Sequence, residues 1–118
     1  MPRKPVFHVV VLTGNERQAK RAGAIQALVT AESPHPIRVE LIAPAWTPNW
    51  GRVLAEFRRA LRNADAAVIG TYIPTELGHA ARAEVRRLDV PYISSDALGQ
   101  HGIANAVLAA VAHTGKAA

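Results

Sequence analysis

The sequence contains no cysteine among its 118 residues. Disulfides, thiolate nucleophiles, iron–sulfur clusters and cysteine-ligated zinc sites are therefore excluded. Aromatic residues make up only 5% of the chain, so we expect no platform of rings for stacking single-stranded bases. Apolar runs such as Val9–Leu12 and Val107–Ala112 fall far short of the ~20 residues that span a bilayer. With no signal peptide readable after Met1, we expect a soluble cytoplasmic protein without membrane partners.

The chain also has fewer acidic than basic residues. Nine Asp and Glu stand against 14 Lys and Arg, which gives a net charge of +5. Hydrophobic residues at 49% and charged residues at 19% are ordinary values for a globular protein. The length suits one hydrophobic core, so we expect a single domain over residues 1–118, with an ordered core from about 6 to 113.

Several catalytic and cofactor motifs are absent. The chain has no GxGxxG, no GK[ST] and no GxSxG elbow, which disfavours Rossmann dinucleotide binding, P-loop chemistry and serine hydrolysis. The five histidines show no HxxxH or HExxH spacing, so we predict no metal site and assign no cofactor. Two alternatives stay open. One is a metal site assembled from distant loops, for example by His79 and His101, and the other is haem ligation by one exposed histidine or by Tyr72.

The hydrophobic pattern alternates between strands and amphipathic helices. Phe7–Thr13 and Asp65–Gly70 are nearly continuous apolar runs, typical of strands buried on both faces. Ile37–Ile42 alternates and Val90–Ser94 contains a proline, which favours edge positions for both. Helices are expected over Glu16–Glu32, Trp50–Asn63, Glu76–Leu88 and Ile103–His113.

Four strand–helix units in succession predict an α/β fold. We expect a small Rossmann-like or flavodoxin-like (βα)4 domain whose four-stranded parallel sheet has the order 2-1-3-4. That order places the topological switch between the first and third strands. Ligands of such sheets bind at the carboxyl ends of the strands that flank the switch.

Two loops meet at this predicted edge. The first places Gly14 and Asn15 before a helix N-terminus, which favours an anion. The second, Gly70–His79, combines hydroxyls, a phenol, a carboxylate and an imidazole. Ordinary turns and helix capping are the plainer alternative. We predict binding of a small anionic or nucleotide-like ligand by Thr13, Gly14, Asn15, Gly70, Thr71, Tyr72, Thr75, Glu76, Gly78 and His79.

Two resemblances accompany this interpretation. The order of elements, the strand Asp65–Ile69 and the ending Leu98–Leu108 resemble the small bacterial domain-of-unknown-function family 2325. That resemblance implies a bacterial protein with a Rossmann-like fold and no assigned activity. The chain departs from the family in having one glycine in the first loop, where a pair is common. His79 also stands a few residues later than the family's loop histidine.

Ala64–Val68 and Glu76–Ala80 are similar to motifs of the nucleoside 2-deoxyribosyltransferase-like proteins. This resemblance implies that Glu76 is a nucleophile at the sugar C1, in a hydrolase or transferase acting on N-glycosidic bonds. It covers about a quarter of the chain, and the usual Asp before the Glu is missing. Whether the protein is an enzyme is left open.

Two further expectations concern partners. Arg52, Arg58, Arg59 and Arg62 give one helix a basic face, so nucleic-acid binding is an alternative function, although such runs are usually only solvated. A four-stranded sheet has two open edges that invite pairing. The last helix has a broad apolar arc with Leu108 at its far side. We therefore predict a homodimer.

Overall fold

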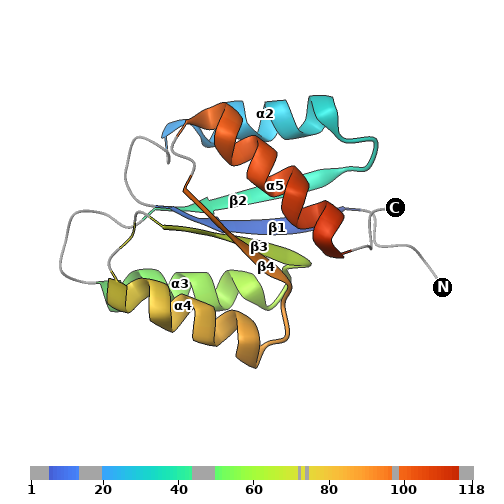
Figure 1. The fold of residues 1–118 in the computed structure, drawn as a ribbon. Helices are drawn as coiled ribbons and strands as arrows, with labels where there is room; N and C mark the ends of the chain where they lie inside the picture. Colours follow the sequence, from blue (N-terminus) through green and yellow to red (C-terminus); the bar gives the residue numbers. More distant parts are fainter. Residues whose placement is uncertain are drawn as a thin grey trace.

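The computed structural model describes residues 6–13, 20–43, 50–71, 73, 75–96 and 99–114. Within these ranges, four strands form one parallel sheet in the order β2-β1-β3-β4 (Figure 1). The strands are β1 (Phe7–Leu12), β2 (Ile37–Ile42), β3 (Ala66–Gly70) and β4 (Tyr92–Ser95). The helices are α2 (Ala22–Glu32), α3 (Trp50–Leu61), α4 (Thr75–Arg87) and α5 (Gln100–Thr114). The predicted α/β class, parallel sheet and strand order are confirmed.

The two most apolar strands lie in the centre of the sheet. From Val9 onwards β1 is buried, and so is all of β3, because helices cover both of their faces. The edge strands β2 and β4 are partly exposed. The register pairs Val9 with Ala66 and Leu12 with Ile69. Continuous apolar runs therefore distinguish central from edge strands, as the sequence pattern predicts.

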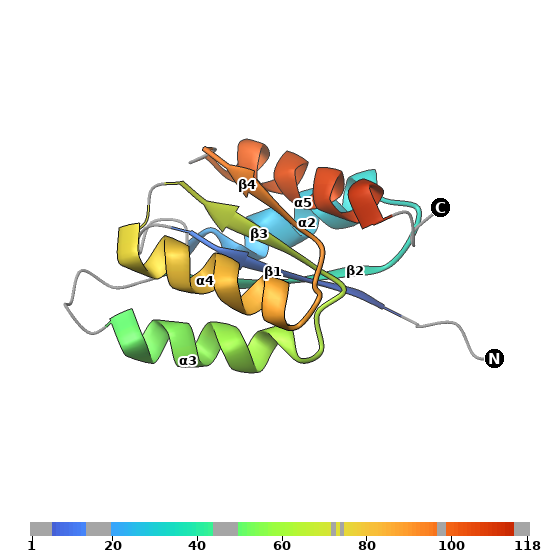
Figure 2. The ribbon, with the colours of Figure 1, turned by 60° about the horizontal axis from the view of Figure 1, so that its bottom comes forward.

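Helices pack on the two faces of the sheet in pairs. We call α2 with α5 the α2–α5 layer, and α3 with α4 the α3–α4 layer (Figures 1 and 2). Val9 and Val11 face the first layer, whereas Val10 and Leu12 face the second. Successive side chains of a strand point to opposite faces, so β1 contributes to both cores. None of the described helices has the length and apolar character needed to cross a bilayer.

Several element ends differ from the prediction. β3 begins at Ala66 and not at Asp65, whose carboxylate instead accepts a bond of 2.9 Å from the His8 N–H. α5 begins at Gln100, three residues before Ile103, because Gly102 does not break the helix there. α4 ends at Arg87, and the left-handed Asp89 (φ 54°) follows it, as is common after a helix. β4 covers Tyr92–Ser95 and not Val90–Ser94.

Candidate functional site

The switch between β1 and β3 lies where the sequence places it. α2, the next described helix after β1, covers one face of the sheet, and α4, which follows β3, covers the other (Figure 2). The chain therefore diverges from the carboxyl ends of two neighbouring strands toward opposite faces. In parallel α/β sheets this divergence opens the crevice that ligands use.

Gly70 lets the ends of these two strands approach closely. A Cβ atom on Gly70 would lie 3.1 Å from the carbonyl oxygen of Leu12 and 3.3 Å from the Cα of Thr13. Both of these are backbone atoms with little freedom to move. The close approach predicted for the two loops is therefore present at Thr13 and Gly70.

The backbone amides at the strand ends already have partners. The Thr13 N–H donates to the Ile42 carbonyl at 3.1 Å, and the Thr71 N–H donates to the Ser95 carbonyl at 2.9 Å. These bonds extend the ladder of the sheet by one residue on each side. A ligand at this edge would therefore meet hydroxyl groups and not the amides of these two threonines.

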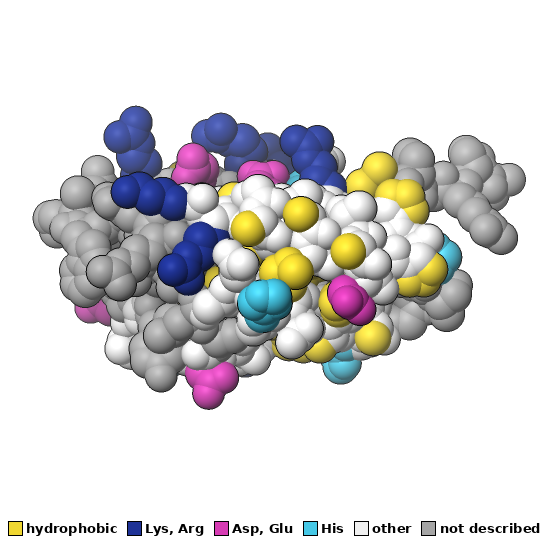
Figure 3. All heavy atoms as spheres, turned by 90° about the horizontal axis from the view of Figure 1, so that it is seen from above, with side chains coloured by type: hydrophobic (Ala, Val, Ile, Leu, Met, Phe, Trp, Pro, Cys, Tyr) yellow, Lys and Arg dark blue, Asp and Glu magenta, His cyan; other side chains and the backbone are white. Residues whose placement is uncertain are grey.

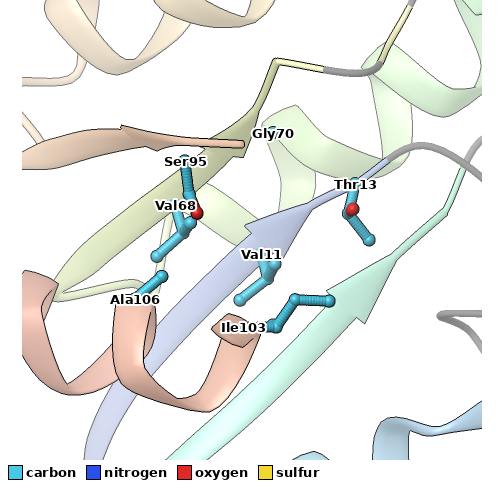
Figure 4. A pocket seen from close by; sticks show the side chains of 7 residues that line it. All are labelled: Val11, Thr13, Val68, Gly70, Ser95, Ile103 and Ala106. Carbon is cyan, nitrogen blue, oxygen red and sulfur yellow. The ribbon is translucent and has the colours of Figure 1, made fainter. Parts of the chain in front are cut away.

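A small pocket opens beside these strand ends, on the face that α5 covers. In Figure 4, Val11 and Val68 rise from the strands toward α5, with Ser95 and Thr13 on opposite sides. Its volume of about 10 Å³ is room for about one water molecule. Thr13 is a buried polar residue, with 3% of its surface exposed. The lining consists of Val11, Thr13, Val68, Gly70, Ser95, Ile103 and Ala106.

The other described residues of the predicted site do not line this pocket. Thr71, Thr75, Glu76 and His79 are exposed, and the last three belong to α4. Because α4 covers the opposite face of the sheet, the structure does not bring Glu76 or His79 into the pocket beside Thr13. The predicted site residues Gly14, Asn15 and Tyr72 lie outside the described residues.

Gly78 is buried, and the protein's own side chains lie against it. A Cβ on Gly78 would meet the two terminal nitrogens of Arg82 at 3.5 and 3.6 Å, and Ile73 Cδ1 at 3.7 Å. The sequence placed Gly78 among the ligand-binding residues. The group that lies against it is the guanidinium of Arg82, one turn further along α4.

Ser95 and the first turns of α5 are pocket residues that the site prediction omitted. Ser95 is the last residue of β4, and Ile103 lies in the first turn of α5. The switch-point rule points only to the two strands that flank the switch. The carboxyl ends of all parallel strands share one edge, and this geometry would have included Ser95.

Glu84 links the two helices of the α3–α4 layer. Its carboxylate lies 3.0 Å from Arg58 Nη2 and 2.9 Å from Arg87 Nη2. Burial by itself raises the pKa of Glu84, but the bonds from Arg87 and Arg58 outweigh it and hold the pKa below the usual value. Of the four arginines in the predicted basic face, Arg58 is thus paired, whereas Arg52, Arg59 and Arg62 are exposed.

Within the described ranges, no three His, Asp or Glu residues gather in a way that could hold a metal ion. Comparison with known proteins gives no match to a family model, to a curated protein or to a solved structure. Both resemblances drawn from the sequence therefore stay predictions.

Proposed function

We propose that the protein binds a small anionic, nucleotide-like ligand at the carboxyl edge of its sheet. The observation that carries this proposal is the convergence of Thr13, Gly70 and Ser95 beside the first turn of α5. A helix N-terminus carries positive partial charge and free N–H groups. A Cβ on Gly99, just before α5, would meet no described atom within 4 Å. The net charge of +5 also favours an anion.

The pocket limits how such a ligand would sit. With room for about one water molecule, it would accept one oxygen or methyl-sized group, and the rest of the ligand would lie over the strand ends. The amides at residues 13 and 71 are already bonded, so the hydroxyl of Thr13 would donate to an anionic oxygen, with Ser95 lining the other side of the pocket.

The test is thermal unfolding with inorganic phosphate and with nucleoside mono-, di- and triphosphates. A ligand at 100 times its Kd stabilises the fold by about 2.7 kcal/mol, which raises the Tm by several degrees. Ser95→Ala should reduce that rise, whereas Ser94→Ala, one residue earlier on the exposed side of β4, should leave it unchanged. If millimolar concentrations of none of these anions shift the Tm of the unaltered protein, the proposal is wrong.

We also propose that the protein forms a homodimer through its α2–α5 layer. Within their bounds, α2 carries Glu32 as its one charged residue and α5 carries no Lys, Arg, Asp or Glu. In Figure 3, Lys and Arg side chains lie along the far margin and the left end of this face, away from its middle. Two copies of charge +5 would meet there with the least repulsion.

Leu108 has a different position from the one expected. It is half-buried and packs against the protomer's own core, so a dimer would bury the neighbouring small side chains. Ala109→Arg should give a monomer in light scattering at micromolar concentration, and Ala83→Arg on exposed α4 is the matched control. A mass of 12.6 kDa at every concentration of the unaltered protein would contradict the dimer.

A further inference from the structure

Charge is distributed unevenly between the two helical layers. The α3–α4 layer carries six arginines within its helices, against three glutamates, and Arg62 follows α3 directly. The α2–α5 layer carries one charged residue within its helices, Glu32. The net charge of the described helices is therefore concentrated on one side of the sheet. We call the exposed arginines of that side the basic surface: Arg52, Arg59, Arg62, Arg86 and Arg87.

The arginines of α3 lie on the side that faces away from the sheet. Phe57 and Leu61 are buried in the core, with 0% and 1% of their surfaces exposed. Arg52 and Arg59 are seven residues apart, two turns along the same outer stripe, which places them ~10 Å apart along the helix axis. Glu56 is the acidic residue of this stretch. The outer stripe of α3 thus carries Arg52 and Arg59 with Glu56 between them, and Arg62 follows the helix.

Ordinary helix stabilisation accounts for part of this arrangement of arginines. Arg58, Arg59, Arg86 and Arg87 stand in last turns, where a cation interacts favourably with the helix dipole. Arg52 stands in the first turn of α3, which contains no acidic residue, and a positive charge there opposes the dipole. Glu56, four residues further along the same helix, is the acidic neighbour that offsets this charge.

Arg87 of α4 lies beside α3 because an ion pair holds the two helices together, whereas Arg86 donates to the hydroxyl of Tyr92 in β4 at 3.4 Å. Arg58 of α3 pairs with Glu84 of α4 at 3.0 Å, and Arg87 binds the other oxygen of the same carboxylate. One glutamate thus serves two arginines, and a positive charge is left over. The side chain of Arg87 is still 60% exposed, so it can reach a second anion in solution.

The chemistry of this surface fits phosphate. Guanidinium groups bind phosphate oxygens in pairs and are always charged. Among the side chains that the structure describes, Val6 is the one exposed large apolar residue, and it lies outside α3 and α4, so the described side chains of these helices supply no apolar anchor for a membrane or a protein hot spot. With aromatics at 5% of the chain, single-stranded bases would find few rings to stack on.

We propose that the basic surface binds the phosphate backbone of double-stranded nucleic acid without reading its sequence. Five arginine–phosphate contacts would give a slope of log affinity against log salt of about −4.5. Affinity would then fall about 500-fold between 50 and 200 mM salt. This function uses the face of the sheet opposite the pocket, and it does not depend on the ligand proposed above.

The experiment is fluorescence anisotropy with a labelled 20-base-pair duplex, measured over a series of salt concentrations. The double variant Arg52→Gln, Arg59→Gln should make the slope shallower by about 1.8 and weaken binding about 60-fold at 100 mM salt. The matched control is Lys20→Gln, Arg21→Gln, which removes the same charge from exposed residues before α2. It should change binding much less, and circular dichroism checks that both variants are folded.

Four outcomes would overturn the proposal. An equal loss of duplex affinity in the two double variants would show that binding depends only on the net charge of the protein. A single strand bound more tightly than the duplex would point to stacking. Competition by vesicles of anionic lipid at equal phosphate concentration would favour a membrane surface. If a mononucleotide that raises the Tm also displaces the duplex, the duplex binds at the carboxyl edge and not on the basic surface. If no mononucleotide raises the Tm, only the ligand proposed for the carboxyl edge is contradicted.

Discussion

The two helical layers perform the same structural task with different residues. The core under the α2–α5 layer is built from Val, Ile and Ala, and α5 alone contributes three alanines, at 104, 106 and 110. The core under the α3–α4 layer contains Phe57 and the leucines at 12, 61 and 77. Many small contacts stabilise one side, and a few large side chains stabilise the other.

The outer surfaces of the layers differ independently of the cores. Both layers bury alternate side chains of the same central strands, so packing imposes no difference in charge between their solvent-facing sides. Yet nearly all helical charge lies on α3 and α4. The difference teaches that the solvent-facing residues of this fold are free to specialise: one layer is suited to self-association and the other to anions.

Truncating the largest core side chain should have the largest effect. Phe57→Ala in the α3–α4 layer should lower the free energy of unfolding by about 3–5 kcal/mol, because Phe57 is fully buried. Val29→Ala, equally buried in the α2–α5 layer, removes two methyl groups at ~0.8 kcal/mol each plus a cavity term. Urea denaturation measures both, and equal losses would contradict the contrast between the two cores.

Gly70 and Gly78 differ in whether their surroundings leave room for a side chain. Gly70→Ala should destabilise the fold by about 1–3 kcal/mol, because its Cβ would press on the backbone of Leu12 and Thr13 at 3.1 and 3.3 Å. Gly78→Ala should stabilise α4 by up to about 1 kcal/mol, since its Cβ would meet Arg82 and Ile73 at ordinary contact distances. Thermal unfolding tests both, and a neutral Gly70→Ala would remove the argument for a close approach at the switch.

Glu84→Gln should cost about 1 kcal/mol, because two partly exposed arginines lose their shared carboxylate. Since its pKa is lowered in the folded state, Glu84 contributes stability above its unfolded pKa and loses it as the pH falls through the lower folded value. The difference between the unaltered protein and the variant should therefore shrink under acid. Glu32→Gln on exposed α2 is the control, and a difference that persists at pH 2 would contradict the ion-pair explanation.

The sequence predicts the sheet well because burial on both faces leaves a direct signature. Continuous apolar runs identify β1 and β3 as central. Element ends were less predictable: Asp65 stands just before β3, and its carboxylate accepts a bond from the N–H of His8, 57 residues away. The meeting of Thr13 with Gly70 followed from the strand order, whereas Glu76 does not line the pocket beside them, and its place in the ligand site stays a prediction. Right-handed crossovers already place the helix after β3 on the other face.

Glu76→Gln should have the smallest effect on the fold. Glu76 is exposed in the first turn of α4, so the variant should lose at most about 1 kcal/mol of interaction with the helix dipole. If the protein only binds its ligand, as we propose, neither form should release free base from a panel of nucleosides and nucleotides assayed by chromatography. The Tm rise caused by phosphate ligands should also be the same in both forms, because Glu76 lies on the layer opposite the pocket. Base release that requires the carboxylate would instead assign N-glycosidic chemistry to the α3–α4 side, and the catalytic group would then lie on the same layer as the basic surface.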